Sequence, residues 1–202
     1  MPTTNNLNGN LLNTVSFHAL KSLSVSDQLC SIMCNSKVLP YATIGKLLHI
    51  SAESAGQSFD LDEVSLLRLL QQNALLVQGN WVVRSELVFP KGAKSACSKE
   101  IPFTNVSHEM LCRARNYILW LYTRQRSLRR ADLIQTVRIP PDHITLILQQ
   151  FAVFNPATRH WDFVFPTDLE FVSCHKNVAK RQEQVWEEMG AELSKLFGRP
   201  ST

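Results

Sequence analysis

Residues 142–166 read DHITLILQQFAVFNPATRHWDFVFP, and their pattern of apolar and polar side chains indicates the fold. Its first part carries apolar side chains at a helical period, namely Ile144, Ile147, Leu148 and Phe151. This spacing predicts a helix over residues 142–151 with one face turned inward. Two apolar runs follow, residues 152–154 and 161–165, and the polar residues 155–160 separate them. Runs arranged in this way predict the two strands of a β-hairpin.

The same order occurs earlier in the chain, in residues 60–90, DLDEVSLLRLLQQNALLVQGNWVVRSELVFP. Asp60 followed by Glu63 predicts the start of a helix, because carboxylates satisfy the free N–H groups of a first turn. The core face expected for this helix consists of Leu61, Val64 and Leu67. Residues 75–77 and 81–83 then predict two strands joined by a tight turn, Gln78-Gly79-Asn80.

Three landmarks recur in both stretches: Gln71-Gln72 and Gln149-Gln150, Trp81 and Trp161, and Phe89-Pro90 and Phe165-Pro166. Two further helices are expected before each stretch, at residues 26–34, 41–48, 105–122 and 129–137. Three helices followed by a hairpin is the order of a winged helix, an elaboration of helix-turn-helix. The repeat therefore predicts a mainly α fold with small β-hairpins (α+β), built as tandem winged-helix domains with a C-terminal helix.

The expected organisation has five segments: a flexible leader (1–25), winged-helix domain 1 (26–90), a linker (91–104), winged-helix domain 2 (105–166), and a C-terminal helix and tail (167–202). Residues 51–58 are small and polar, which predicts a loop. Thr167 and Glu170 predict the start of the terminal helix. Its apolar stripe comprises Val178, Val185, Met189 and Leu196, with Trp186 beside it. Such a stripe packs more often on its own domain than on a partner.

Positive charge is concentrated in one part of the chain. The formal net charge is +4, whereas residues 91–132 alone hold nine basic and three acidic side chains. The candidate contact residues are Arg113, Arg115, Arg124, Arg126, Arg129 and Arg130. They fit contact with a nucleic-acid backbone, contact with an acidic protein surface, or a solvated face. Arg115 lies one helical turn from Leu111, so we expect its stem to pack and its head to pair with a carboxylate.

The charge of the third helix in each unit disfavours standard docking on DNA. In helix-turn-helix proteins that helix enters the major groove. The helix expected over residues 60–74 carries three carboxylates against Arg68, and the one over residues 142–151 carries Asp142 and no Lys or Arg. Phosphate groups would repel such helices.

Tryptophans mark the expected core. A tryptophan on a hairpin strand most often packs between the strands and the neighbouring helices. We therefore expect Trp81 and Trp161 to be structural core anchors, and Trp120, which follows the apolar stripe of its helix, to be buried as well.

Signatures of catalysis and of metal binding are missing from the sequence. It has no Gly-rich phosphate loop, no GxSxG elbow and no HExxH helix. Its five cysteines include no CxxC, and the pairs Cys30/Cys34 and His108/Cys112 are too few ligands for a structural zinc site. Buried or half-buried thiols are expected instead. No apolar run approaches the length of a membrane span. We expect no enzyme activity, cofactor, metal, membrane contact or small-molecule substrate.

Several stretches resemble one known family: residues 79–86 (GNWVVRSE) with 89–91 (FPK), residues 109–120 (EMLCRARNYILW), residues 161–166 (WDFVFP) with Asp168, Glu170 and Phe171, and then Val178, Arg181-Gln182 and Trp186. Together they are similar to the C-terminal region of the fifth-largest subunit of animal RNA polymerase III. The resemblance keeps its order and spacing over about residues 60–197, and residues 1–25 add nothing to it.

The resemblance implies a non-catalytic component of a nuclear transcription enzyme. In that family the C-terminal extension consists of tandem winged helices, and the N-terminal part pairs with another subunit in a module similar to the general factor TFIIF. No counterpart of that pairing region is recognised in this sequence, so the resemblance leaves docking on the polymerase open.

The implied function is a protein-interaction module that supports assembly and initiation in the transcription of small non-coding RNA genes. Its implied partners are other RNA polymerase III subunits, extending to the initiation factors and, weakly and without sequence preference, to DNA backbone. The alternative is a free-standing DNA-binding transcription regulator that uses the basic patch Arg124–Arg130.

Overall fold

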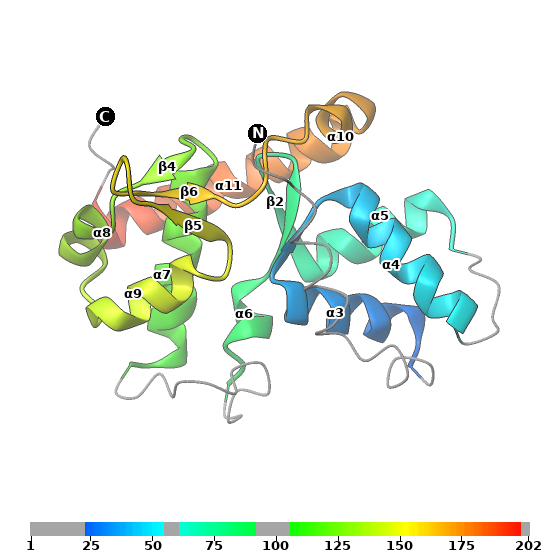
Figure 1. Cartoon of the computed structure of the whole chain (residues 1–202), viewed down its shortest axis with the longest axis horizontal. Coiled ribbons are helices and arrows are strands. Elements are labelled where there is room, and N and C mark those ends of the chain that lie inside the picture. Colours follow the sequence, from blue (N-terminus) through cyan, green and yellow to red (C-terminus); the bar gives the residue numbers. More distant parts are fainter. Residues whose placement is uncertain (1–22, 55–60, 92–105, 199–202) are drawn as a thin grey trace.

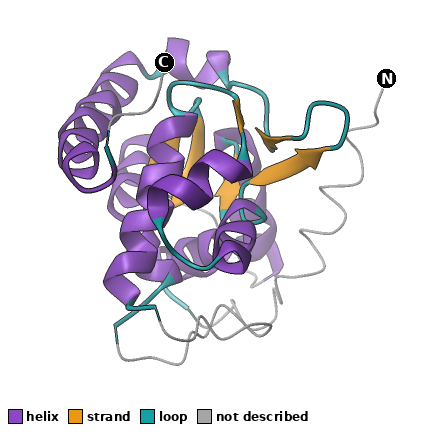
Figure 2. Cartoon of the chain, turned by 90° about the vertical axis from the view of Figure 1, so that its left-hand side faces the viewer, coloured by secondary structure: helices purple, strands orange, loops and turns teal. Residues whose placement is uncertain are grey.

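The computed structural model describes residues 23–54, 61–91 and 106–198, with the backbone alone for residues 50–54 (Figure 1). Most of the expected leader and linker, and the expected cap Asp60, lie outside these residues. Helices dominate, and the strands form small sheets between them (Figure 2). The prediction of a mainly α fold with small β-hairpins is therefore confirmed.

Two units of the chain repeat one order of elements: helix, strand, helix, helix, strand, strand. The first unit consists of α3 (Val25–Ser36), β1 (Val38–Leu39), α4 (Tyr41–Ser54), α5 (Glu63–Asn73), β2 (Ala74–Val77) and β3 (Asn80–Val83). The second unit consists of α7 (His108–Tyr122), β4 (Ser127–Leu128), α8 (Arg130–Val137), α9 (Pro141–Leu148), β5 (Ala152–Asn155) and β6 (His160–Phe163). Each unit holds an antiparallel sheet, with strand order β1-β3-β2 in the first and β4-β6-β5 in the second.

Short elements account for most differences from the prediction. Strands β1 and β4 have two residues each, and α6 (Ser85–Val88) is a single turn that the sequence did not suggest. Elements of this length are too short to show a hydrophobic period. Helix α4 continues to Ser54, so part of the loop expected over residues 51–58 is helical.

Two helix starts were placed wrongly. Helix α5 is capped by Asp62, whose side chain accepts a hydrogen bond from Ser65 N at 2.9 Å. The helix therefore turns Leu66, Leu67 and Leu70 inward, while Val64 is 67% exposed. The terminal helix is likewise capped by Asp168 instead of Thr167, and the Asp168 carboxylate accepts a hydrogen bond from Phe171 N at 2.8 Å.

The terminal helix is broken in two, α10 (Leu169–Cys174) and α11 (Lys176–Phe197), because His175 leaves the helical conformation with φ −115° and ψ 50°. The stripe predicted for α11 is correct in part. Val178, Val185 and Met189 are half-buried and pack against the core, whereas Leu196 is 57% exposed. The fully buried residues are Gln182, Trp186, Gly190 and Leu193. A polar residue and a glycine belong to this buried face, so apolar periodicity alone did not identify them. Helix α11 packs against both β2 and α7 and thereby joins the two units.

The turn between β2 and β3 requires glycine. Gln78 and Gly79 have φ 50° and 77°, the left-handed region that two-residue hairpin turns demand. A β-carbon at position 79 would also overlap the backbone carbonyl of Asp168. We expect Gly79→Ala to reduce the free energy of unfolding by about 2 kcal/mol or more, measured by urea denaturation.

A matched control lies within α4. Gly45 is in the helix interior, and a β-carbon there would meet nothing within 4 Å. Gly45→Ala is expected to raise stability by about 0.5–1 kcal/mol, because alanine is the better helix former. Equal effects of the two substitutions would contradict this interpretation of the turn.

Candidate interaction surfaces

Arg115 is fully buried between the two units, so its assignment as a contact residue is wrong. Its guanidinium donates to the Val83 carbonyl at 2.8 Å, to Ser85 Oγ at 3.0 Å and to Gln150 Oε1 at 2.8 Å. Burial lowers the pKa of Arg115 to about 10, so the group is still charged at neutral pH. Within the described residues it forms no ion pair, contrary to the expected carboxylate partner. The position of Arg115 on its helix turns the side chain inward, and the acceptors around the guanidinium are neutral.

Arg126 and Arg130 are also engaged within the molecule. Arg126 donates to the carbonyls of Phe163 and Phe165 at 3.0 and 2.7 Å, and to Gln78 Oε1 at 3.0 Å. It therefore links the second hairpin to the turn of the first. Arg130 donates to the Pro141 carbonyl at 3.2 Å. The basic cluster of the sequence is thus partly a set of structural hydrogen-bond donors.

Arg113, Arg124, Arg126 and Arg129 are exposed, but the guanidinium of Arg126 is already bonded within the molecule. The guanidinium of Arg124 lies over the ring of Trp120, 4.7 Å from its centroid. Arg113, Arg124 and Arg129 are therefore the exposed members of the cluster that are not used in such hydrogen bonds among the described residues.

The predicted anchor tryptophans are all buried. Trp81 packs edge-on against Phe171 with ring centroids 5.7 Å apart, and Trp161 packs against Phe154 at 5.6 Å. Trp120 lies against α11 at Gly190, where a β-carbon would overlap the indole. Each tryptophan therefore joins a strand or a helix to its neighbour.

Trp186 has a function in the fold that the sequence did not reveal. Its indole N–H donates to the Leu76 carbonyl at 2.7 Å, and the Leu76 N–H donates to Gln182 Oε1 at 3.1 Å. Gln182 and Trp186 stand one turn apart on α11, and both side chains are buried. Together they satisfy the outer edge of strand β2. The four-residue spacing of Gln182, Trp186 and Gly190 was the feature of the sequence that could have indicated this buried face.

The first hairpin is enclosed on all sides. Every residue of β2 and β3 is buried. At its turn, Gln78 Nε2 donates to the Tyr122 carbonyl at 2.7 Å and Asn80 Nδ2 donates to the Pro166 carbonyl at 3.0 Å. This hairpin is part of the junction between the units and presents no free wing.

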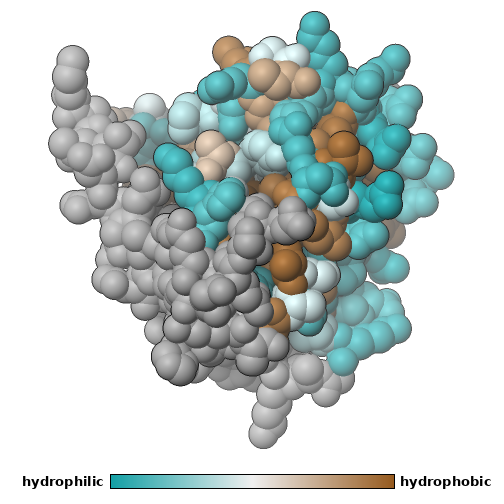
Figure 3. Space-filling model, turned by 90° about the vertical axis from the view of Figure 1, so that its right-hand side faces the viewer, coloured by the Kyte–Doolittle hydropathy of each residue, from teal (hydrophilic) through white to brown (hydrophobic). Residues whose placement is uncertain are grey.

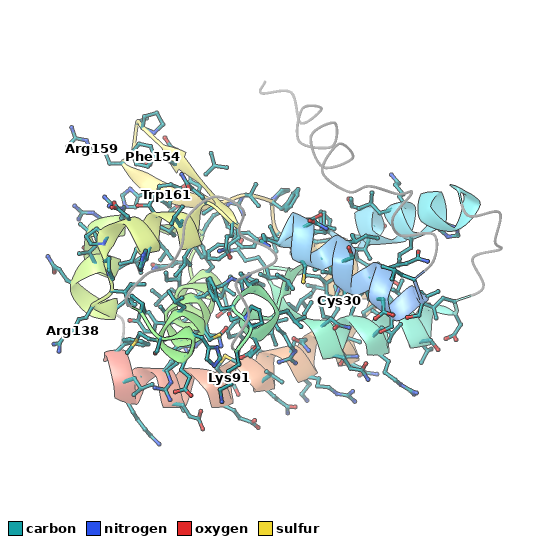
Figure 4. The ribbon with its side chains drawn as sticks, turned by 90° about the horizontal axis from the view of Figure 1, so that it is seen from below. Cys30, Lys91, Arg138, Phe154, Arg159 and Trp161 are labelled. Atoms are coloured by element: carbon teal, nitrogen blue, oxygen red, sulfur yellow. The ribbon has the colours of Figure 1, made fainter. Side chains whose placement is uncertain are left out.

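The second hairpin is open to solvent. On β5, Val153 is 55% and Phe154 is 48% exposed. Figure 4 shows Phe154 and Arg159 at the outer end of this hairpin, with Arg138 at the same end of the molecule. The two hairpins share one fold but differ completely in accessibility.

Further surface features lie elsewhere. An open groove of about 760 Å³ runs between the first hairpin and α11, lined among others by Trp120, Arg124, Lys180 and Glu183. Its rim carries charges of both signs, which favour no partner charge. At the end of the molecule formed by the first unit, Figure 3 shows apolar surface between hydrophilic residues. Helix α5 with its exposed Val64 lies at that end (Figure 1).

The titratable pairs noted in the sequence form no reactive centre. Cys112 Sγ lies 3.8 Å from His108 Nδ1, but burial raises the pKa of Cys112 to about 11, so it is a thiol at neutral pH. Among the described residues, no three His, Cys, Asp or Glu side chains come together as metal ligands. Cys30 and Cys34 are half-buried as expected, whereas Cys174 is exposed. None of the helices in the described ranges has the length and apolar character needed to span a membrane.

Comparison with known proteins gives one family. The chain is 33% identical over 185 residues to the DNA-directed RNA polymerase III subunit RPC5 of Mus musculus, which is 92% of this chain and 24% of that relative. The Homo sapiens subunit gives the same identity and coverage. The chain thus spans about a quarter of the length of these curated relatives. The family model described as RPC5 protein matches residues 2–195. The match therefore extends on the N-terminal side of residues 60–197, which carried the resemblance, and includes residues 2–25, which were expected to add nothing to it. This chain belongs to the RPC5 protein family.

Proposed function

We propose that this chain is a non-catalytic interaction and assembly module of RNA polymerase III that works in the nucleus. Both curated relatives are subunits of that polymerase, which supports a part in its transcription. The proposal includes support of initiation at small non-coding RNA genes and contact with initiation factors. It also treats residues 26–90 and 105–166 as two winged-helix domains, since both units repeat the same order of elements.

The observation that carries a protein-interaction function is the enclosure of the first hairpin. A winged helix that binds DNA needs an accessible recognition helix and an accessible wing. Here strands β2 and β3 are entirely buried, and α11 satisfies the edge of β2. The hairpin of the first unit therefore has a structural function, and it is not accessible as a wing that could bind a nucleic acid.

The third helices agree with this reading. On α9, Asp142 is exposed, as is Gln149 at the C-cap, and the helix has no Lys or Arg. On α5, Asp62 and Glu63 are exposed at the N-terminal end, with Arg68 further along. A helix with this charge gains little from phosphate contacts. Protein surfaces are the more suitable partners.

Affinity purification tests the proposal. The tagged chain is recovered from nuclear extract at moderate salt, and the bound proteins are identified by mass spectrometry. We expect RNA polymerase III subunits to be enriched over a tag-only control. Recovery of a folded chain without any polymerase subunit would contradict the proposed function.

Contact with DNA backbone is the second candidate, favoured by Arg113, Arg124 and Arg129, which are exposed and not engaged like Arg126. Each phosphate contact lowers the slope of log affinity against log salt by about 0.9. We expect weak binding with a slope no steeper than about −3 and no more than about a tenfold preference between duplexes. Fluorescence titration of two unrelated duplexes at several salt concentrations measures both quantities.

The double variant Arg124→Ala/Arg129→Ala should flatten that slope by about two. Arg181→Ala removes an exposed arginine from α11, outside the cluster, and serves as the control that leaves the slope unchanged. A strong preference for one duplex that survives the double variant would favour the regulator alternative instead.

A further inference from the structure

The two sheets have the same register, which makes Leu76 and Phe154 equivalent positions. Leu76 pairs with Trp81, and Phe154 pairs with Trp161. One hydrogen bond next to each hairpin shows which residue pairs are hydrogen-bonded. In the first unit the Arg84 N–H donates to the Asn73 carbonyl, and in the second the Val164 N–H donates to the Phe151 carbonyl. Because hydrogen-bonded and non-hydrogen-bonded pairs alternate along an antiparallel ladder, both residues fall in non-hydrogen-bonded pairs. The backbone N–H and C=O of each therefore point away from the sheet.

In the first unit, helix α11 occupies this outer edge. Gln182 Oε1 accepts from the Leu76 N–H at 3.1 Å, and Trp186 Nε1 donates to the Leu76 carbonyl at 2.7 Å. One helix thus supplies an acceptor and a donor, four residues apart, to the two outward backbone groups of a single strand residue. The indole of Trp186 also covers the apolar surface of the strand.

In the second unit the equivalent edge is unoccupied by the described part of the chain. No side chain or backbone group among the described residues bonds to the outward N–H or C=O of Phe154. Strand β2 packs against α5, α7 and α11, whereas β5 packs extensively against β6 alone. Val153 and Phe154 are about half exposed. An unpaired strand edge with exposed apolar side chains marks an interaction site.

We propose that the outer edge of β5, centred on Phe154, is a docking site for an α-helix of a protein partner, an inference that rests on the proposed interaction function. That helix presents an acceptor and a donor side chain one turn apart, as Gln182 and Trp186 do for Leu76. Its apolar side chains cover Val153 and Phe154. The contacts between α11 and β2 in the first unit are the model for this interface, and β5 in the second unit is the strand equivalent to β2.

The charge around the hairpin indicates an acidic partner helix. Residues 105–166 contain eight arginines and four carboxylates. Exposed Arg159 and Arg138 lie at the same end of the molecule as Phe154 (Figure 4). The carboxylate of the hairpin itself, Asp162, accepts hydrogen bonds from Ser127 Oγ at 2.6 Å and Asn155 Nδ2 at 3.0 Å, and these hydrogen bonds hold its pKa below the usual value, so it stays charged. The arginines outnumber the carboxylates even with Asp162 included, so carboxylates on the flanks of the partner helix meet a net positive charge.

A nucleic-acid backbone does not suit this edge. Phosphate oxygens accept hydrogen bonds but donate none, so they leave the outward carbonyl of Phe154 without a partner. They also gain nothing from the exposed side chains of Val153 and Phe154. The edge therefore favours a protein over the phosphate backbone of DNA or RNA.

Site-specific photo-crosslinking tests the proposal. A benzophenone amino acid replaces Phe154 in the tagged full chain, expressed in animal cells, and mass spectrometry identifies the crosslinked peptide. The matched control carries the same group at Val64, an exposed apolar position on α5. We expect crosslinks from position 154, in at least about tenfold excess over position 64, to an acidic amphipathic helix of another protein. Crosslinks to nucleic acid, to an extended strand or to a second copy, or none above the control, would overturn it.

Two substitutions then test the edge itself. Phe154→Pro removes the outward N–H and the phenyl ring but no hydrogen bond of the ladder, because the ladder bonds are made by the neighbouring residues. Phe154→Asp places a carboxylate among the carboxylates of the partner. Each should lower recovery of the captured protein at least about tenfold, with the melting profile showing that the chain is still folded. Unchanged recovery with both variants would overturn the proposal.

The identity of the captured protein separates this inference from the proposed function. A helix of an RNA polymerase III subunit or initiation factor supports both. A helix of an unrelated protein supports the docking edge and contradicts the polymerase function.

Discussion

Replacing Arg115 with alanine is expected to lower the free energy of unfolding by about 3–5 kcal/mol. The substitution empties a fully buried volume and removes the donor to the Val83 carbonyl, Ser85 Oγ and Gln150 Oε1. A buried acceptor without a partner costs about 1–3 kcal/mol, and the hydroxyl and amide have freedom to reorient while the carbonyl does not. The loss should therefore reach the range of a large core truncation to alanine.

Urea denaturation followed by circular dichroism measures the Arg115 effect. Arg113→Ala is the matched control, since it removes the same side chain from an exposed position on the same helix. Its effect should stay within about 0.5 kcal/mol. If the two variants unfold at the same urea concentration, Arg115 does not join the units in the way described.

Trp186→Ala is expected to cost a similar amount, about 3–5 kcal/mol, the usual range for a buried tryptophan. The indole is buried between α11 and the edge of β2, and its N–H is bonded to the Leu76 carbonyl. The truncation opens a cavity and exposes that strand edge. Loss of fluorescence from this residue complicates optical detection, so calorimetry is the suitable measurement.

Trp186→Phe separates the two contributions. The phenyl ring keeps most of the packing but lacks the N–H, so the Leu76 carbonyl is left without its donor at a cost of about 1–3 kcal/mol. Glu187→Ala, at the exposed position next along the helix, should be nearly neutral. A phenylalanine variant as stable as the parent would show that the hydrogen bond at the strand edge contributes nothing.

The sequence predicted the features whose signals are local. Helix α7, capped by Ser107, lies within the residues 105–122 where a helix was expected, and the turn Gln78–Gly79 lies where the glycine places it. Both hairpins were found because apolar runs flank a turn or polar loop in each. These elements depend on neighbours within about ten residues, which a period or a turn motif records.

Features that depend on distant residues were missed or misassigned. The partners of Arg115 come from β3, α6 and the end of α9, and no local pattern distinguishes a buried arginine from an exposed one on the same helix. Gln182 lies on the core face of α11 because a strand edge needs an acceptor there. A periodicity argument reads that glutamine as solvent-facing. The difference between the two hairpins likewise arises from α11, which covers one and not the other.

The bonds between Leu76 and α11 join residues 106 and 110 positions apart in the chain. During synthesis, the first unit therefore leaves the ribosome well before the helix that completes its sheet. Until α11 is made, the edge of β2 is as open as the edge of β5, and contacts of such long range form late in folding. A nascent or truncated chain that ends before residue 176 would carry two unpaired strand edges instead of one, and we expect it to aggregate or to be retained by chaperones.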